Sequence, residues 1–109
     1  MYKITDTLEF THTVAVMVPA DGGHVEQTLK VRFTIEPARK SDSLEPPTDD
    51  ALQDILRRII VSIEDVVDDD DNPIPYNDAI RDRLLALPFV RVAIWRSYMG
   101  AVTKAKVGN

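Results

Sequence analysis

Two segments near the N-terminus alternate apolar and polar residues with a period of two, which is typical of β-strands. The apolar positions have even numbers within residues 8–18 and odd numbers within residues 25–35. A two-residue turn centred on residues 21–22 would pair Val18 with Val25 and would place the large apolar residues on one face. The pattern therefore predicts an antiparallel β-hairpin. Its opposite face carries the polar residues Glu9, Thr11, Thr13, Glu26, Thr28, Lys30, Arg32 and Thr34.

The residues after the hairpin change first to a linker and then to a helix. Residues 37–48 contain three prolines and show no periodicity, which is typical of a linker. Thr48 is the predicted N-cap of the helix, because Asp49 and Asp50 follow in the first turn, where the helix dipole favours acidic side chains. Spacings of three and four predict one buried stripe along this helix: Leu52, Ile55, Leu56, Ile59, Ile60 and Ile63.

Two further helices are predicted beyond the four aspartates at residues 68–71. Pro73 and Pro75 prevent the first helix from continuing, and Asn77 is the expected cap of the next one. Pro88 suits the first turn of a third helix. The residues of the second helix that we expect to face the core are Ile80, Leu84 and Leu87.

The composition fits one domain, because 109 residues with 44% apolar side chains cannot supply two cores. We therefore predict a single α+β domain over residues 1–109, with an N-terminal antiparallel β-hairpin in 1–36, a linker in 37–48 and about three α-helices in 49–104. The chain has no cysteine, which excludes disulfides and cysteine-based zinc sites. No apolar run approaches the roughly 18 residues that a membrane span needs, so we expect a soluble protein without a membrane partner.

The third helix is apolar around most of its circumference, so it must be covered on more than one side. It is expected to be either the central helix of a three-helix core or, in part, a surface that binds another protein. Arg91 is expected either to pack its stem against an aromatic face or to bind a partner's carboxylate. The candidate partner-binding residues are Arg91, Ile94, Trp95, Tyr98, Met99 and Val102.

Charge is distributed unevenly along the chain. Residues 41–82 hold thirteen acidic residues and three arginines, whereas residues 83–109 hold five basic residues and no acidic one. The acidic middle would repel nucleic acid, so we expect no nucleic-acid partner. Contact between acidic and basic regions is plausible within one subunit or between copies. The two unpaired edges of a hairpin add to this expectation of a homo-oligomer, because strand addition between copies would cover them.

No motif in the chain predicts catalysis, a metal or a cofactor. A calcium loop that began at Asp68 would need glycine at its sixth position and glutamate at its twelfth, where this chain has Pro73 and Ala79. The acidic cluster is therefore expected to be a hydrated spacer, with an irregular cation site as the open alternative. His12 is expected at the edge of the core with a local hydrogen bond, far from His24. We expect a protein that is not an enzyme.

The segment from residue 63 to residue 100 resembles a known family. The helix that ends in "IVSIEDVVDDDDNPIPYND", followed by "LLALPFVRVAIWRSYMGA", is similar to the tail assembly chaperones of long-tailed bacteriophages, the siphoviruses. The order of hairpin, linker and helices extends the similarity over most of the chain. Family members often have tryptophan where this chain has Ile63, and glycine where it has Asp71.

The resemblance implies a protein that binds the tape measure protein, helps to recruit the tail tube protein during tail morphogenesis, and is absent from the finished virion. It implies action in the cytoplasm of the host cell and a longer product made by programmed ribosomal frameshifting. Two other interpretations stay open. One is an acidic inhibitor that mimics nucleic acid, and the other is a structural tail or head-to-tail subunit.

Overall fold

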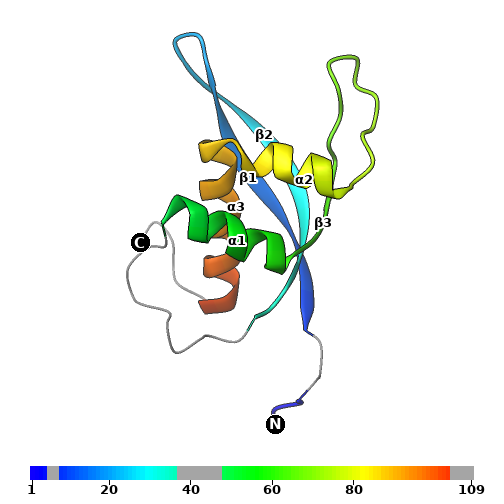
Figure 1. The fold of residues 1–109 in the computed structure, drawn as a ribbon, viewed down its shortest axis with the longest axis vertical. Helices are drawn as coiled ribbons and strands as arrows, with labels where there is room; N and C mark the ends of the chain where they lie inside the picture. The colour runs from blue at the N-terminus through cyan, green and yellow to red at the C-terminus, as the bar shows by residue number, and fades with distance from the viewer. Residues whose placement is uncertain (5–7, 37–47, 104–109) are drawn as a thin grey trace.

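The computed structural model describes residues 1–4, 8–36 and 48–103 and has the predicted α+β fold. Its elements in chain order are β1 (Glu9–Ala20), β2 (Gly23–Thr34), α1 (Asp49–Ile59), β3 (Ile60–Glu64), α2 (Asp78–Leu85) and α3 (Pro88–Thr103). The strands form one antiparallel sheet in the order β1-β2-β3. The helices lie near one half of a long, twisted hairpin, whose tip extends beyond them (Figure 1). Almost all of the predicted linker lies outside the described residues.

The hairpin has the predicted register. Val18 pairs with Val25 and Phe10 with Phe33, and the turn lies at residues 21–22, where Gly22 has a positive φ of 77°. Glycine suits this position because it has no Cβ to clash in the left-handed region. The core face buries Val14, Val16, Val31 and Phe33.

The prediction that the first helix extends to Ile63 is wrong, because the helix ends before this residue. α1 ends at Ile59, and the chain then forms β3, in which Ile63 pairs with Val31 of β2. Ile60 and Ile63 are both buried, although residues three apart in a regular strand would point to opposite faces. A register shift gives β3 one extra residue at this point, so both isoleucines reach the core.

The two predicted helix caps are confirmed. The Thr48 hydroxyl accepts a hydrogen bond from the Ala51 backbone N–H, and the Asn77 side-chain oxygen accepts one from the Ile80 N–H at 2.9 Å. The predicted inner face of α2 is partly wrong. Ile80 and Leu84 are half-buried, whereas Leu87 is exposed because it follows the end of α2, in the turn before α3. Leu85 is fully buried instead.

The acidic residues 68–71 form the tip of an arm between β3 and α2. Val67 and Pro73 form a β-bridge at its base, and the Asp68 carboxylate accepts hydrogen bonds from the backbone N–H groups of Asp70 and Asn72 at 2.9 and 3.0 Å. The bond from Asn72 is the main reason that the pKa of Asp68 lies below its ordinary value. All four aspartates are exposed. Within the described ranges, no three acidic or histidine side chains converge as metal ligands.

Asp71 has a positive φ of 62°, in the left-handed region that favours glycine. Glycine would adopt this conformation without a steric cost, because it has no Cβ. Asp65, at the start of the arm, has a similar φ of 65°. Aspartate tolerates the left-handed region better than most residues do, but it retains a steric cost that glycine avoids.

We predict that Asp71→Gly raises the free energy of unfolding by about 0.5–1 kcal/mol, because the relief of left-handed strain exceeds the added entropy of the unfolded chain. Urea denaturation measures this change. Asp70→Gly is the matched control, since Asp70 has no positive φ and its loss removes the same charge. Equal effects of the two substitutions would show that charge, and not backbone strain, dominates.

We predict a second, pH-dependent effect at Asp68. Because its pKa is lower in the folded protein, the ionised carboxylate contributes stability that is complete above the ordinary value of 3.8 and is lost as the pH falls through the folded pKa. The difference in unfolding free energy between the native protein and Asp68→Asn should therefore be constant near neutral pH and shrink below that value. A constant difference for Asp68→Asn down to the lowest pH would contradict the prediction.

Candidate protein-binding groove

Helix α3 is anchored to the sheet by one apolar stripe. Val90, Ile94 and Tyr98 are spaced by four residues and are buried. The Tyr98 ring lies 5.4 Å from that of Phe33 between centroids, and its hydroxyl accepts a hydrogen bond from the Glu36 backbone N–H at 3.3 Å. α3 contacts β1, α1 and α2, so it is covered on more than one side, as predicted.

The six predicted partner-binding residues divide into two groups. Arg91, Ile94 and Tyr98 are buried by the chain's own residues, so in this structure they form part of the core and not an open surface. Trp95, Met99 and Val102 are half-buried, and the Trp95 ring stacks on Tyr98 at 5.9 Å between centroids. A role of these three residues in partner binding stays a prediction.

Arg91 makes its polar contacts with residues of its own chain, and its predicted contact with an aromatic face or with a partner's carboxylate stays a prediction. Its guanidinium Nη1 donates a hydrogen bond to the Leu85 backbone oxygen at 2.9 Å, and Nη2 lies 3.9 Å from an Asp49 carboxylate oxygen. Only 7% of the residue is exposed. The C-terminus of α2 carries partial negative charge, so this position stabilises a buried cation. Arg91 therefore connects α3 to the end of α2 and the start of α1.

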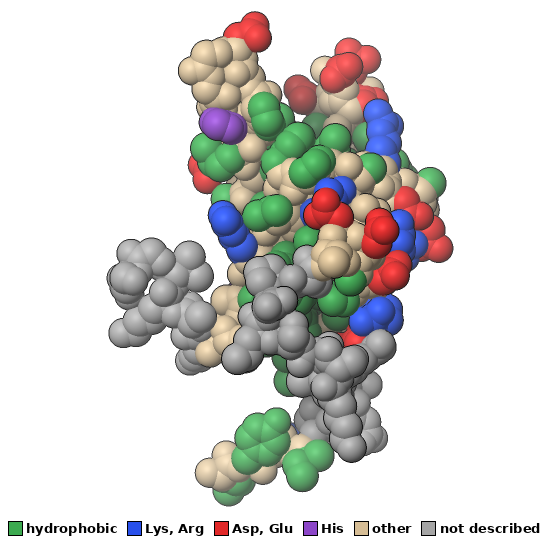
Figure 2. All heavy atoms as spheres, turned by 60° about the vertical axis from the view of Figure 1, so that its left-hand side comes forward, with side chains coloured by type: hydrophobic (Ala, Val, Ile, Leu, Met, Phe, Trp, Pro, Cys, Tyr) green, Lys and Arg blue, Asp and Glu red, His purple; other side chains and the backbone are tan. Residues whose placement is uncertain are grey.

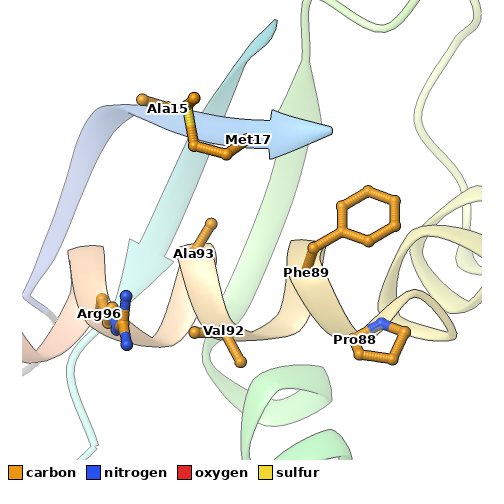
Figure 3. A pocket seen from close by; sticks show the side chains of 7 residues that line it. All are labelled: Ala15, Met17, Pro88, Phe89, Val92, Ala93 and Arg96. Carbon is orange, nitrogen blue, oxygen red and sulfur yellow. The ribbon is translucent and has the colours of Figure 1, made fainter. Parts of the chain in front are cut away.

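An open groove of about 460 Å³ lies between the edge strand β1 and the exposed side of α3. Met17 of β1 is 52% exposed and Val92 of α3 is 42% exposed. Figure 3 shows Phe89 and Ala93 on the side of α3 that faces β1, with Met17 between the strand and the helix. The lining is apolar except for one cation, and consists of Ala15, Met17, Pro88, Phe89, Val92, Ala93 and Arg96. We call this feature the β1–α3 groove.

Hydrophobic side chains also gather over a broad area below the hairpin tip in the space-filling view (Figure 2). Part of this exposure arises because the tip extends beyond the helices, so Val25 of β2 is exposed. Together with the exposed Met17 and Val92 of the groove, these side chains make the surface less polar than solvated helix and strand faces usually are.

The groove residues of β1 were not predicted from the sequence. Ala15 and Met17 have odd numbers, and they are the apolar exceptions on a strand face that otherwise carries Glu9, Thr11 and Thr13. An exposed methionine on a polar strand face was the signal that could have found them. On α3 the binding residues predicted from the sequence surround Trp95, whereas the groove is lined by Phe89, Val92 and Ala93.

The histidines do not form a site. His12 pairs with Val31 in the hairpin register, but its side chain is exposed and contacts the edge of the Phe10 ring at 5.0 Å between centroids. The predicted local hydrogen bond is not formed with any described residue, whereas the contact with Phe10, which packs against the core, agrees with a position at the core edge. His24 lies near the start of β2, opposite Pro19 of β1.

A second hollow, of about 540 Å³, lies between β2 and the acidic arm and is mainly polar. Its lining comprises Gln27, Thr28, Asp65, Val67, Asp68, Asp69 and Asp71. The exposed carboxylates there repel one another and make no convergent ligand set. In the part of the chain that the structure describes, no helix is long and apolar enough to cross a membrane.

Comparisons with known proteins give no relative for this chain. No protein-family model matches it, and no curated protein and no solved structure shows significant similarity to it.

We predict that Arg91→Met lowers the free energy of unfolding by about 1–3 kcal/mol, because it leaves the buried Leu85 carbonyl without its donor. The matched control is Arg96→Met. Arg96 is exposed and has no hydrogen bond or ion pair with another described residue, so its loss should change stability by less than about 0.5 kcal/mol. Urea denaturation of both variants measures the difference. Equal stabilities of the two variants would contradict a structural role of Arg91.

Proposed function

We propose that this protein is a tail assembly chaperone of a long-tailed bacteriophage. In this proposal it binds the tape measure protein in the cytoplasm of the host cell, helps to recruit the tail tube protein, and leaves before the virion is complete. It acts by reversible binding, without a cofactor and without catalysing a reaction. The observation that carries the proposal is the open, apolar β1–α3 groove, and the resemblance of residues 63–100 to this family supports it.

The groove has the chemistry of a protein-binding surface. Met17 and Val92 remain exposed, and half-buried Phe89 extends the apolar area between them. Exposed apolar area of this kind favours association, because burying it against another protein removes it from water. A tape measure protein is a long chain that would aggregate if its apolar segments stayed uncovered. A chaperone with an apolar groove could cover such segments until the tail tube forms around them.

The charge pattern suits reversible binding. The four aspartates at the tip of the arm are exposed, and Asp49 and Asp50 add negative charge at the start of α1. Such exposed charges change the rate of encounter with a charged partner more than the final affinity, and salt screens them over about 10 Å. Copies of the chain are proposed to associate along one tape measure protein, as the expected homo-oligomer.

We predict that the tape measure protein copurifies with this protein when the two are coexpressed, and that Val92→Asp reduces the affinity about tenfold or more, because it places a charge in the apolar groove. The matched control is Val61→Asp, which changes a valine of similar exposure on β3, outside the groove. Circular dichroism checks that both variants fold.

Trp95→Asp extends this experiment to the residues chosen from sequence. Loss of tape measure binding with retained helical content would place Trp95 in the interface, and loss of the fold would assign it to the core. Absence of binding by the native protein would contradict the proposed function. Retention of the protein in purified virions would favour a structural tail subunit.

A further inference from the structure

The β1–α3 groove is bordered by backbone groups that have no hydrogen-bond partner among the residues that the structure describes. Ile35 donates its backbone N–H to the Leu8 oxygen at 3.0 Å, and the register places these two residues opposite each other. Directly opposite residues in an antiparallel pair alternate between those that exchange hydrogen bonds and those that do not. The even-numbered residues of β1 therefore direct their N–H and C=O groups toward β2, and the odd-numbered ones direct theirs away.

These outward groups lie at the free edge of the sheet. β1 is an edge strand, and no other described backbone group bonds the N–H or C=O of Thr11, Thr13, Ala15 or Met17. Pro19 also has an odd number, so β1 loses no hydrogen bond to β2 through the missing N–H of this proline. Pro19 therefore ends the row of outward N–H donors. β1 pairs with β2 without a bulge, so its edge is not bent away from an incoming strand.

The same residues supply both the free backbone groups and part of the groove. Ala15 and Met17 line the groove with their side chains while their N–H and C=O groups point outward. A strand added to β1 would form main-chain hydrogen bonds, and every second side chain could contact Phe89 and Ala93, which face β1 (Figure 3). This combination is the geometry of strand addition, in which the backbone gives affinity and the pockets give specificity.

The charge of the groove restricts the incoming segment. Arg96 is the only charged residue of the lining, and no described carboxylate pairs with it. On the polar face of the hairpin, Arg32 already binds Glu9 at 2.9 Å and the Thr11 hydroxyl at 3.1 Å. A carboxylate on the incoming segment would therefore find its complement at Arg96.

We propose that the edge of β1 and the β1–α3 groove bind an extended segment of a partner protein, with apolar side chains at alternating positions and a carboxylate that pairs with Arg96. This inference rests on the proposed function only in using the same groove. It adds that the bound segment is a strand and not a helix, and that it is acidic.

Two synthetic peptides of identical composition, built from valine, threonine and glutamate, test this proposal. The first alternates valine with polar residues and ends in glutamate, and the second places the valines at helical spacings of three and four. We expect the first to bind more tightly. It should slow amide hydrogen exchange of Thr11, Thr13, Ala15 and Met17 by about tenfold or more, because these N–H groups gain acceptors.

Charge reversal tests the role of Arg96. Arg96→Glu should weaken binding of the alternating peptide about tenfold, whereas Arg83→Glu, at an exposed arginine of α2 outside the groove, should leave it unchanged. Tighter binding of the helically spaced peptide, or binding without protection of the odd-numbered amides, would overturn the proposal. If the odd-numbered amides become protected without peptide as the protein concentration rises, a second copy of the chain occupies the edge, and the proposal is overturned.

The tape measure experiment separates this inference from the proposed function. If the tape measure protein copurifies but neither peptide binds, the strand inference fails and the chaperone function stands. If the alternating peptide binds and the tape measure protein does not, the strand inference stands and the partner is a different protein.

Discussion

A two-stranded hairpin has no core of its own, so the apolar face of β1 and β2 must be covered by the rest of the chain. Tyr98 is central to this cover, because its ring packs against Phe33 and Phe10 while its hydroxyl accepts the N–H of Glu36, just beyond the end of β2. The stripe that continues through Ile94 and Val90 sets the path of α3 along the sheet. β3 extends the same face beyond β2 and brings Ile60 and Ile63 under the helices.

The location of the groove follows from this packing. A helix packs one stripe of side chains against a sheet. Because Ile94 and Tyr98 of α3 lie in the core, Val92 and Arg96 lie on a different side of the helix. The residues on that other side are not the polar ones that a solvated helix would have. The apolar side chains of Phe89 and Ala93 face the apolar exceptions on β1 (Figure 3), and Val92 adds an exposed apolar side chain to the lining, so the combined surface is what an additional polypeptide could cover.

Sequence patterns predicted the hairpin and the helix caps well, because local chemistry determines them. A period of two together with a glycine turn permits one register, and Thr48 and Asn77 cap helices with their own side chains. β3 was missed because isoleucines spaced by three fit a helix and equally fit a strand with one extra residue. Leu87 fitted the helical stripe of α2, but the helix ended before reaching it.

The groove was harder to predict, because it depends on tertiary packing. The sequence shows that α3 is apolar on several sides, but which side meets the sheet depends on the rotation of the helix about its axis. Tyr98 and Arg91 fix that rotation through contacts with residues far apart in sequence, namely Phe33, Leu85 and Asp49. Half of the residues chosen for the surface were therefore in the core, and Met17 was overlooked because it belongs to a distant strand.

The position of Arg91 has a consequence for how the molecule could respond to a ligand. The Arg91 guanidinium bonds the last turn of α2 and approaches the first turn of α1. A shift of α3 would therefore leave a buried cation without its hydrogen-bond acceptor. Such a helix is a preorganised platform that keeps its shape. The entropic penalty of ordering would then fall on the ligand, which makes affinity depend on how readily that ligand adopts its bound conformation.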